Sequence, residues 1–259
     1  MPIVLVTGAA GRIGRELRPW LARPGRTLRL LDEVDCGPAG AAEEVLVGSV
    51  TDPDLVARAC AGADAVVHLA GIPGEAPWAD LLHVNVHGTQ VVLDAAAAAG
   101  VPRVVLASSN HAVGMTPLPE RGRIPATVLP RPDTFYGASK AALEALGALY
   151  ADRQGLDVSS LRIGTCSPAP ESVRELSSWL SFDDCARLVE ACLAAPGPPA
   201  HRLLWGVSAN TRGFASLAEG EAIGYHPQDD AEAYADRVGG EPEPLVGGEF
   251  TRAPLGEPT

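Results

Sequence analysis

The 259-residue sequence lacks the features of several protein classes. Its five cysteines are scattered and form no C-x-x-C pair, so they suggest neither a disulfide framework nor a zinc site. Positive charge is scarce, and the formal net charge of -12 argues against a nucleic-acid partner or an anionic membrane surface. The apolar stretch from Val91 to Leu106 is interrupted by Asp94, Pro102 and Arg103, so it is too broken to cross a bilayer. With no signal peptide visible, the sequence predicts a cytoplasmic protein with reduced thiols.

Two histidine and serine patterns that would indicate other chemistry are incomplete. His83 and His87 have the i, i+4 spacing of a zinc-binding helix, but Val84 stands where the glutamate base would be, and no third ligand is evident. The sequence contains no G-x-S-x-G elbow, so Ser109 and His111 do not indicate a hydrolase. The sequence therefore predicts no metal site.

Short apolar runs alternate with longer helix-like segments along most of the chain. Continuous apolar strands separated by helices predict an α/β fold, a Rossmann-like doubly wound parallel sheet with ligands at the carboxyl ends of its strands. His68, inside one such strand, is expected to be packed with its ring hydrogen-bonded. The expected strands are 3–6, 27–31, 44–47, 65–69, 103–107, 157–163 and 202–205. The expected helices are 12–22, 53–61, 78–99, 134–153 and 182–195.

No repeat or low-complexity linker divides the chain, so residues 1–259 are expected to form one domain. Irregular insertions at about 115–132, 164–181 and 206–250 follow strands, and they are expected to form a small substrate-binding lid. The Pro- and Gly-rich residues 239–259 read as a loose tail.

A strand, a glycine turn and a helix start occupy residues 3–14. Gly8 permits a tight turn, Gly11 lets the backbone approach a pyrophosphate, and Gly14 allows close packing of helix on strand. Backbone N–H groups at the helix start then face the phosphates of a dinucleotide.

Asp32 ends the second apolar strand. An acid at this position accepts hydrogen bonds from the adenosine ribose and repels a 2′-phosphate, which favours NAD over NADP. The alternative is a helix or turn cap. Arg12 or Arg29 could soften the preference for NAD.

Tyr136 and Lys140 form a Y-x-x-x-K pair at the start of an expected helix, where positions i and i+4 share a face. Tyrosine is a base only as phenolate, and a nearby cation lowers its pKa from about 10 toward working pH. The pair alone occurs by chance in many helices. Together with the glycine turn, and with Ser108 and Ser109 at a strand end, it predicts an oxidoreductase active site.

These motifs resemble the extended short-chain dehydrogenase/reductase superfamily. The resemblance implies that Ser109 bonds the reacting hydroxyl or carbonyl, that Tyr136 is the acid/base, and that Lys140 also grips the nicotinamide ribose. Asn85 matches a helix asparagine of the superfamily, although a polar residue that bends the helix is an equal alternative. The predicted cofactor site comprises Gly8, Gly11, Arg12, Ile13, Gly14, Asp32, Val50, Leu69, Ala70, Gly71, Asn85, Lys140 and Ile163.

Four further segments, at 107–111, 161–168, 176–181 and 205–210, are similar to bacterial uronate dehydrogenases. That family oxidises C1 of galacturonate or glucuronate with NAD to an aldarolactone. The resemblance implies that Arg174 binds the substrate carboxylate and that Ser109, Asn110, His111, Tyr136 and Thr165 contact the sugar. Ser49 departs from the pattern, because relatives commonly carry Asp there for the adenine. The role of the proline- and glycine-rich loop 72–77 stays open.

Two alternatives belong to other function classes. A nucleotide-sugar epimerase or dehydratase uses the same scaffold, although this chain lacks the large C-terminal lobe that holds a nucleotide. A non-catalytic NAD sensor usually lacks the tyrosine or lysine, and both are present here. The superfamily often pairs the helices that bear Asn85 and Tyr136 between subunits, so a homo-oligomer is expected. The choice between galacturonate and glucuronate is left open.

Overall fold

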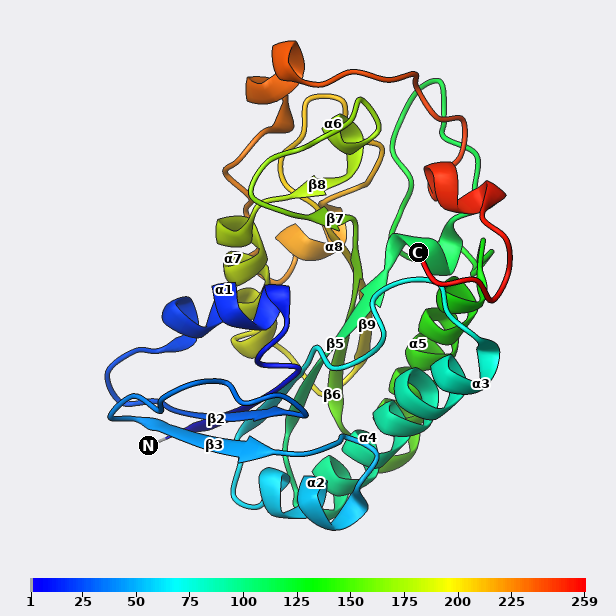
Figure 1. Cartoon of the computed structure of the whole chain (residues 1–259). Helices are drawn as coiled ribbons and strands as arrows, with labels where there is room; N and C mark the ends of the chain where they lie inside the picture. Colours follow the sequence, from blue (N-terminus) through cyan, green and yellow to red (C-terminus); the bar gives the residue numbers. More distant parts are fainter. Residues whose placement is uncertain (1) are drawn as a thin grey trace.

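The computed structural model describes residues 2–259. Its centre is a seven-stranded parallel sheet with the strand order β3-β2-β1-β4-β5-β6-β9 (Figure 1). The order turns back between β1 and β4, which is where doubly wound sheets open a crevice for ligands. The strands are β1 (Ile3–Thr7), β2 (Thr27–Asp32), β3 (Glu43–Val47), β4 (Ala65–His68), β5 (Arg103–Ser109), β6 (Asp157–Ile163) and β9 (His201–Gly206). The predicted fold class and all seven expected strands are confirmed.

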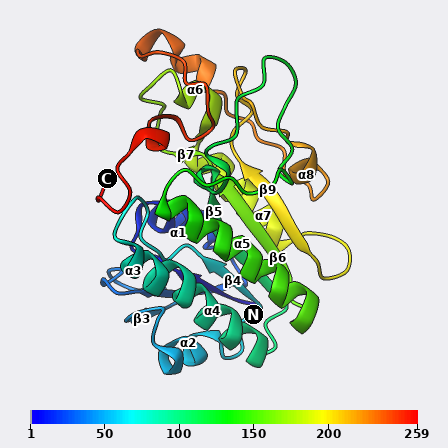
Figure 2. The ribbon, with the colours of Figure 1, turned by 90° about the vertical axis from the view of Figure 1, so that its right-hand side faces the viewer.

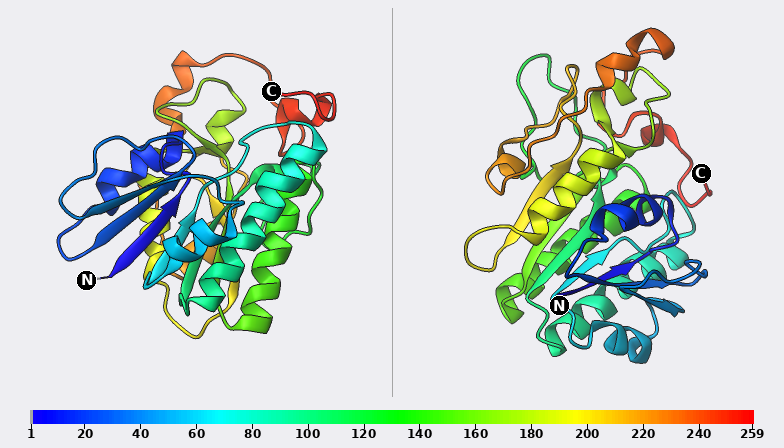
Figure 3. Two further views of the ribbon diagram at one scale, coloured as in Figure 1. Left: turned by 60° about the horizontal axis from the view of Figure 1, so that its bottom comes forward. Right: turned by 90° about the vertical axis from the view of Figure 1, so that its left-hand side faces the viewer.

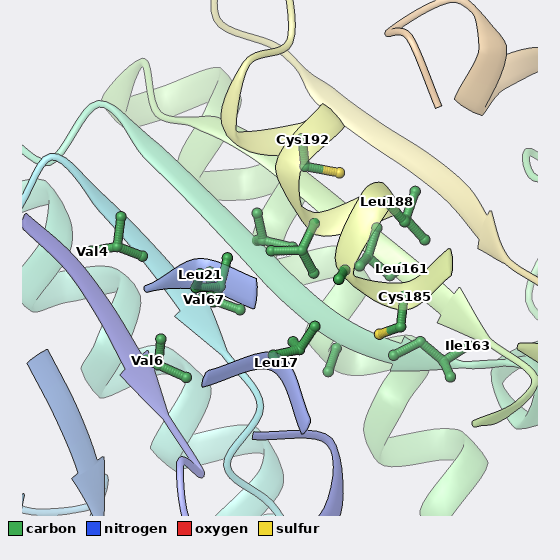
Figure 4. Close-up of a cluster of buried hydrophobic side chains, with 14 of the residues drawn as sticks. Val4, Val6, Leu17, Leu21, Val67, Leu161, Ile163, Cys185, Leu188 and Cys192 are labelled. Atoms are coloured by element: carbon green, nitrogen blue, oxygen red, sulfur yellow. The ribbon is translucent and has the colours of Figure 1, made fainter. Parts of the chain in front are cut away.

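Helices cover both faces of the sheet (Figures 2 and 3). One face carries α1 (Arg12–Leu21) and α7 (Phe182–Leu193), and the other carries α2 (Pro53–Cys60), α4 (Gly88–Ala98) and α5 (Phe135–Gln154). Under α1 and α7, Leu17 and Leu188 join the strand residues Val6 and Leu161 in one apolar cluster (Figure 4). Because apolar layers lie on both faces, the strands read as unbroken apolar runs in the sequence. The five cysteines are free thiols, four of them buried.

The expected continuous helix over 78–99 is wrong in its middle. The chain forms α3 (Trp78–Leu81), a π-helical turn (Leu82–His87) and then α4. Within the π turn, buried Asn85 bonds both backbone groups of Ile72, with Oδ1 accepting at 2.7 Å and Nδ2 donating at 3.2 Å. A π turn carries one extra residue per turn and is common at functional sites. The helix is therefore interrupted at Asn85 by a π turn, while the alternative interpretation, that this residue bends the helix, stays a prediction.

The three irregular insertions pack together beyond the carboxyl ends of the strands, in the upper part of Figure 1. Isolated β-bridges join Pro117 to Leu245, Ile124 to Ala215 and Ser172 to Gly239. Short elements complete this region: the paired strands β7 (Thr165–Cys166) and β8 (Trp179–Leu180), the helices α6 (Glu175–Ser178) and α8 (Ala218–Glu221), and 3-10 turns at Asn110–Val113, Ala231–Arg237 and Gly248–Arg252.

The end of the chain is not the loose tail that its composition suggested. Val246 is buried in an apolar cluster with Ile124 and Phe214. Further on, the backbone N–H groups of Gly256 and Thr259 both donate to Glu75. Tertiary contacts therefore hold a segment that has no regular periodicity of its own. Within residues 2–259, no helix has the length and apolar character needed to cross a membrane.

Candidate active site

A cleft of about 360 Å³ opens at the carboxyl ends of the central strands. It is lined by Arg12, Ile13, Leu69, Gly71, Ile72, Pro73, Ala107, Ser108, Ser109, Asn110, His111, Tyr136, Lys140, Ile163, Gly164, Thr165, Cys166, Arg174, Glu175 and Phe250. The three predicted catalytic residues and every predicted substrate residue are among them. Below, this space is called the active-site cleft.

The glycine turn between β1 and α1 is built as the motif requires. Gly8 has φ +70°, and a Cβ there would lie 2.6 Å from the backbone nitrogen of Ala70. A Cβ at Gly14 would lie 2.4 Å from the carbonyl oxygen of Gly8. No side chain within residues 2–259 caps the start of α1, and its first turn contains no acid. Its first N–H groups are therefore available to an anionic ligand beside Arg12 and Ile13.

Asp32 caps a turn in the structure, and its predicted bonds to the ribose stay a prediction. Its Oδ2 accepts a hydrogen bond from Ala10 N at 2.9 Å, and its Oδ1 accepts one from Val34 N at 3.0 Å. The carboxylate therefore caps the turn next to the glycine motif and keeps lone pairs for ribose hydroxyls. Arg29 is bonded to Glu44 and to two backbone carbonyls. These contacts occupy its guanidinium, so the expectation that Arg29 could bind a 2′-phosphate and soften the preference for NAD is not supported.

Other predicted cofactor residues lie behind the surface of the active-site cleft. Val50 is buried, and its Cγ2 would lie 3.0 Å from a Cβ at Gly88. Asn85 contacts the turn at Gly71, because a Cβ there would lie 2.9 Å from its Oδ1 and 3.7 Å from Lys140 Nζ. Gly8, Gly11, Gly14, Asp32, Val50, Ala70 and Asn85 are not among the lining residues, so their part in binding stays a prediction.

The two helix residues of the predicted catalytic group, Tyr136 and Lys140, lie on one face of α5. Lys140 Nζ lies 5.6 Å from the centroid of the Tyr136 ring and donates to the carbonyl oxygen of Ala107 at 2.8 Å. Ser109 ends β5, and its Oγ accepts a hydrogen bond from His111 N at 3.2 Å. Ser108 turns the other way and donates to Glu144 at 2.7 Å. Ser109, not Ser108, therefore faces the tyrosine.

Burial controls the acid–base properties of this group. It raises the pKa of Tyr136 to about 12, against the lowering effect of a hydrogen bond from Ser109 and with a smaller contribution from Asp133. It also lowers the pKa of Lys140 to about 8. The expectation that Lys140 brings down the pKa of Tyr136 is thus not met in the protein alone, because desolvation raises this pKa and Lys140 is not among the groups that shift it. The same burial depresses His68, whose ring bonds Thr7 and Thr89 as expected, to a pKa of about 3.

Arg174 and His111 supply further polar groups of the active-site cleft. Arg174 Nη2 donates to the carbonyl oxygen of Val246 at 3.0 Å, and its buried Nε has no acceptor within residues 2–259. His111 Nδ1 lies 2.7 Å from Asp133 Oδ2. Because an ionised carboxylate only accepts, Nδ1 carries the proton and Nε2 is left for a ligand. Asn110 donates to Val246 at 3.2 Å.

Several lining residues were not predicted as site residues, among them Ala107, Gly164, Cys166, Glu175 and Phe250. The ring of Phe250 lies 4.2 Å, centroid to centroid, from the ring of His111. It stands in the segment taken for a loose tail, and no periodicity or motif pointed to it. Ile72 and Pro73 show that the loop of undetermined role does reach the active-site cleft.

The glycine turn, the uncapped helix start and Asp32 together fit a dinucleotide, and the comparisons agree. The model of the NAD dependent epimerase/dehydratase family matches residues 4–171. The chain belongs to this family, NAD is its cofactor, and it is an NAD-dependent dehydrogenase, as predicted.

Within the family the chain is similar to uronate dehydrogenases over nearly its whole length. It is 42% identical over 240 residues to uronate dehydrogenase from Agrobacterium fabrum, covering 92% of this chain and 89% of the relative. The crystal structure of a mutant uronate dehydrogenase from Agrobacterium tumefaciens, complexed with NAD, matches with a TM-score of 0.91 at 38% identity over 98% of each chain. NAD-dependent glucose-6-phosphate dehydrogenase from Haloferax volcanii is 38% identical over 256 residues, 89% of this chain and 95% of the relative.

Proposed function

We propose that the protein oxidises a hexuronate, galacturonate or glucuronate, at C1 to the aldarolactone, with Tyr136 as the base. The observation that carries the proposal is the composition of one cleft. A tyrosine, lysine and serine line it together with Arg174, whose buried Nε lacks a partner within residues 2–259. An unpaired buried donor is costly, and a carboxylate oxygen would satisfy it. The similarity to uronate dehydrogenases supports the same substrate.

In the proposed reaction the proton of the C1 hydroxyl passes to the Tyr136 phenolate as C1 becomes a carbonyl carbon. Ser109 Oγ donates a hydrogen bond to the reacting oxygen, and Lys140 favours the phenolate by its charge. When bound, NAD would supply the acceptor for the hydride from C1 and a further positive charge. Arg174 holds the carboxylate at C5, and His111 Nε2 and Thr165 contact ring hydroxyls. Fixing both ends of the sugar orients C1 toward Tyr136.

The insertions at 164–181 and 206–250 are proposed to form the substrate-binding part of a single domain. They contribute Thr165, Arg174 and Phe250 to the active-site cleft. The insertion at 115–132 contributes none of the lining residues described here, so its part is to support the other two.

The first test is NADH absorbance on mixing purified protein and NAD with galacturonate or glucuronate. Galactose and glucose serve as uncharged controls, and glucose 6-phosphate as a sugar with a different acid group. NADH formed with the uronates alone supports the proposal. NADH formed only with glucose 6-phosphate would indicate that the substrate is a sugar phosphate and not a uronate. Turnover of a nucleotide sugar without net NADH would favour an epimerase or dehydratase, and NAD binding without any turnover would favour a sensor.

Two variants test the assigned roles. Tyr136→Phe is expected to lower kcat at least about a hundredfold while NAD still binds. Arg174→Met is expected to raise the KM for the uronate at least about tenfold, since a charge-assisted hydrogen bond is lost. Arg187→Met is the control. Arg187 binds carboxylates, those of Asp184 and Asp229, as Arg174 is proposed to do, but it lies outside the active-site cleft. Equal KM values for Arg174→Met and the control would contradict the carboxylate role.

A further inference from the structure

Glu75 is a buried carboxylate that the proposed reaction does not use. It lies in the loop after β4, is only 2% exposed, and forms no ion pair within residues 2–259. A buried charge without a cation needs other hydrogen-bond donors. At Glu75 these donors are all backbone N–H groups, and two of them belong to the first residues of α5.

The carboxylate completes the start of the catalytic helix. Glu75 Oε2 accepts from Tyr136 N at 2.8 Å, and Oε1 accepts from Phe135 N at 3.3 Å. Thr134 Oγ1 accepts from Gly137 N at 3.0 Å. The first three N–H groups of α5 therefore all have acceptors, two of them on one negative charge at the positive end of the helix.

The same carboxylate also holds the C-terminal segment (residues 245–259). Glu75 Oε1 accepts from Gly256 N at 2.7 Å, and the backbone of Glu75 bonds Thr259 in both directions. The C-terminal segment, red in Figure 1, accordingly lies beside the loop that precedes α3, drawn in cyan. Upstream in this segment, the ring of Phe250 packs at a tilt against the ring of His111. One side chain thus bonds both the residue that carries the phenol and the segment that covers the sugar.

We infer that Glu75 is a positioning residue for Tyr136, fixing the phenol relative to the sugar by holding the first turn of α5 and the C-terminal segment together. Its neighbours support this, because Ile72 and Ala76 from the same loop pack around Tyr136 and Phe135. A displacement of about 1 Å at the reacting group can cost about a hundredfold in rate. A carboxylate that bonds the backbone nitrogen of the base itself is therefore well placed to control kcat. The inference rests on the proposed role of Tyr136 as the base.

Glu75→Gln tests the inference with little change in size. The amide has one acceptor oxygen, so it cannot serve both Tyr136 N and the pair Phe135 N and Gly256 N. We expect kcat to fall about tenfold or more, with the KM for NAD within about twofold of wild type. The matched control is Asp184→Asn. Asp184 is another buried carboxylate, away from the active-site cleft, which accepts from the backbone of Gln228 and Asp229 at 2.8 and 3.0 Å and, unlike Glu75, also pairs with Arg187.

A second readout does not depend on turnover. The phenolate absorbance of Tyr136, obtained as the difference between a protein and its Tyr136→Phe partner, is titrated without cofactor. Burial raises the pKa of Tyr136 to about 12, and we expect Glu75→Gln to lower it as water reaches the phenol.

Each outcome decides the matter. A folded Glu75→Gln protein with kcat within about twofold of wild type, or with no greater loss than Asp184→Asn, overturns the inference. If Glu75→Gln does not fold, Glu75→Asp, which keeps the charge and both oxygens, is judged by the same criteria. If wild-type protein oxidises no sugar, the proposed function fails, and the phenol titration alone decides on Glu75: an unchanged pKa rejects the positioning role.

Discussion

Lys140 is a buried ammonium, and its replacement by methionine separates its cost to stability from its use in catalysis. The side chain is 5% exposed, and within residues 2–259 its Nζ has one hydrogen-bond acceptor, the carbonyl oxygen of Ala107, and no carboxylate partner. Burial lowers its pKa from 10.5 to about 8. We predict that Lys140→Met abolishes turnover but makes the cofactor-free protein more stable at neutral pH.

The magnitude follows from the two pKa values. Well below about pH 8, the charge costs the folded state about 3 kcal/mol, because each pKa unit between 10.5 and about 8 is worth about 1.4 kcal/mol. Loss of the hydrogen bond to Ala107 offsets about 1 kcal/mol of this. The net gain of about 2 kcal/mol should raise Tm by about 4–8 °C in a chain of this length.

The two pKa values also fix the direction in which the stability difference between wild type and Lys140→Met changes with pH. Because the folded pKa lies below the unfolded one, the unfolded chain binds more protons between about pH 8 and 10.5. The stability of wild-type protein therefore rises with pH relative to the variant, and the advantage of Lys140→Met disappears by about pH 10.5.

Urea unfolding of both cofactor-free proteins at about pH 7 and about pH 10 measures this difference. Lys140 is the only lysine in the sequence, so lysine labelled with ¹³C at Cε gives a single NMR signal whose shift against pH reports its pKa directly. A wild-type protein that is the more stable of the two at neutral pH, or a difference that does not change with pH, would refute the reasoning.

Three further predictions concern other parts of the molecule. Asp32→Ala should raise kcat/KM for NADP relative to NAD at least about tenfold, because the repulsion of a 2′-phosphate is removed; an unchanged ratio would reject its role in cofactor choice. Phe250→Ala should raise the KM for the sugar about threefold to tenfold by removing the ring that packs against His111, with the KM for NAD unchanged; equal effects on both KM values would show general damage. Arg162→Met should lower the free energy of unfolding by about 3–5 kcal/mol, since buried Glu144 loses the guanidinium that now donates at 2.9 and 2.8 Å. Urea unfolding checks this, and a loss below about 1 kcal/mol would contradict it.

The sheet and the residues at its carboxyl edge could be predicted because their signals are local. A strand buried on both faces must be an apolar run, and the ends of neighbouring parallel strands meet at one edge. Ser109 ends such a run, and the Tyr136–Lys140 spacing follows from helix geometry, whereas Thr165 was expected only from the resemblance to uronate dehydrogenases. All of these residues line the active-site cleft. The glycine turn is equally local, because Gly8 needs a positive φ that is strained for other residues.

Glu75 and Phe250 could not be predicted, because their contacts join residues far apart in the sequence. The carboxylate of Glu75 meets Gly256, and the ring of Phe250 meets His111, in segments that have no periodicity. Only in the folded chain does Glu75 cap α5 and does Phe250 line the active-site cleft. The π turn at Asn85 could not be predicted for the same reason. Asn85 bonds the backbone of Ile72, in a loop outside the helix, and the apolar pattern of the helix does not indicate that contact.

The distribution of cations supports a titrating role for Lys140. The sequence has 20 Lys and Arg residues, yet Lys140 is its only lysine, and the ion pairs described here that involve a permanent cation all use arginine. Arginine suits those pairs because it stays charged and binds carboxylates with two donors. At position 140, burial moves the pKa to about 8, close to working pH, and the same burial moves Tyr136 to about 12. A guanidinium could not approach neutrality in this way. The one lysine of the sequence therefore stands beside Tyr136, the proposed base, with a charge that responds to its surroundings.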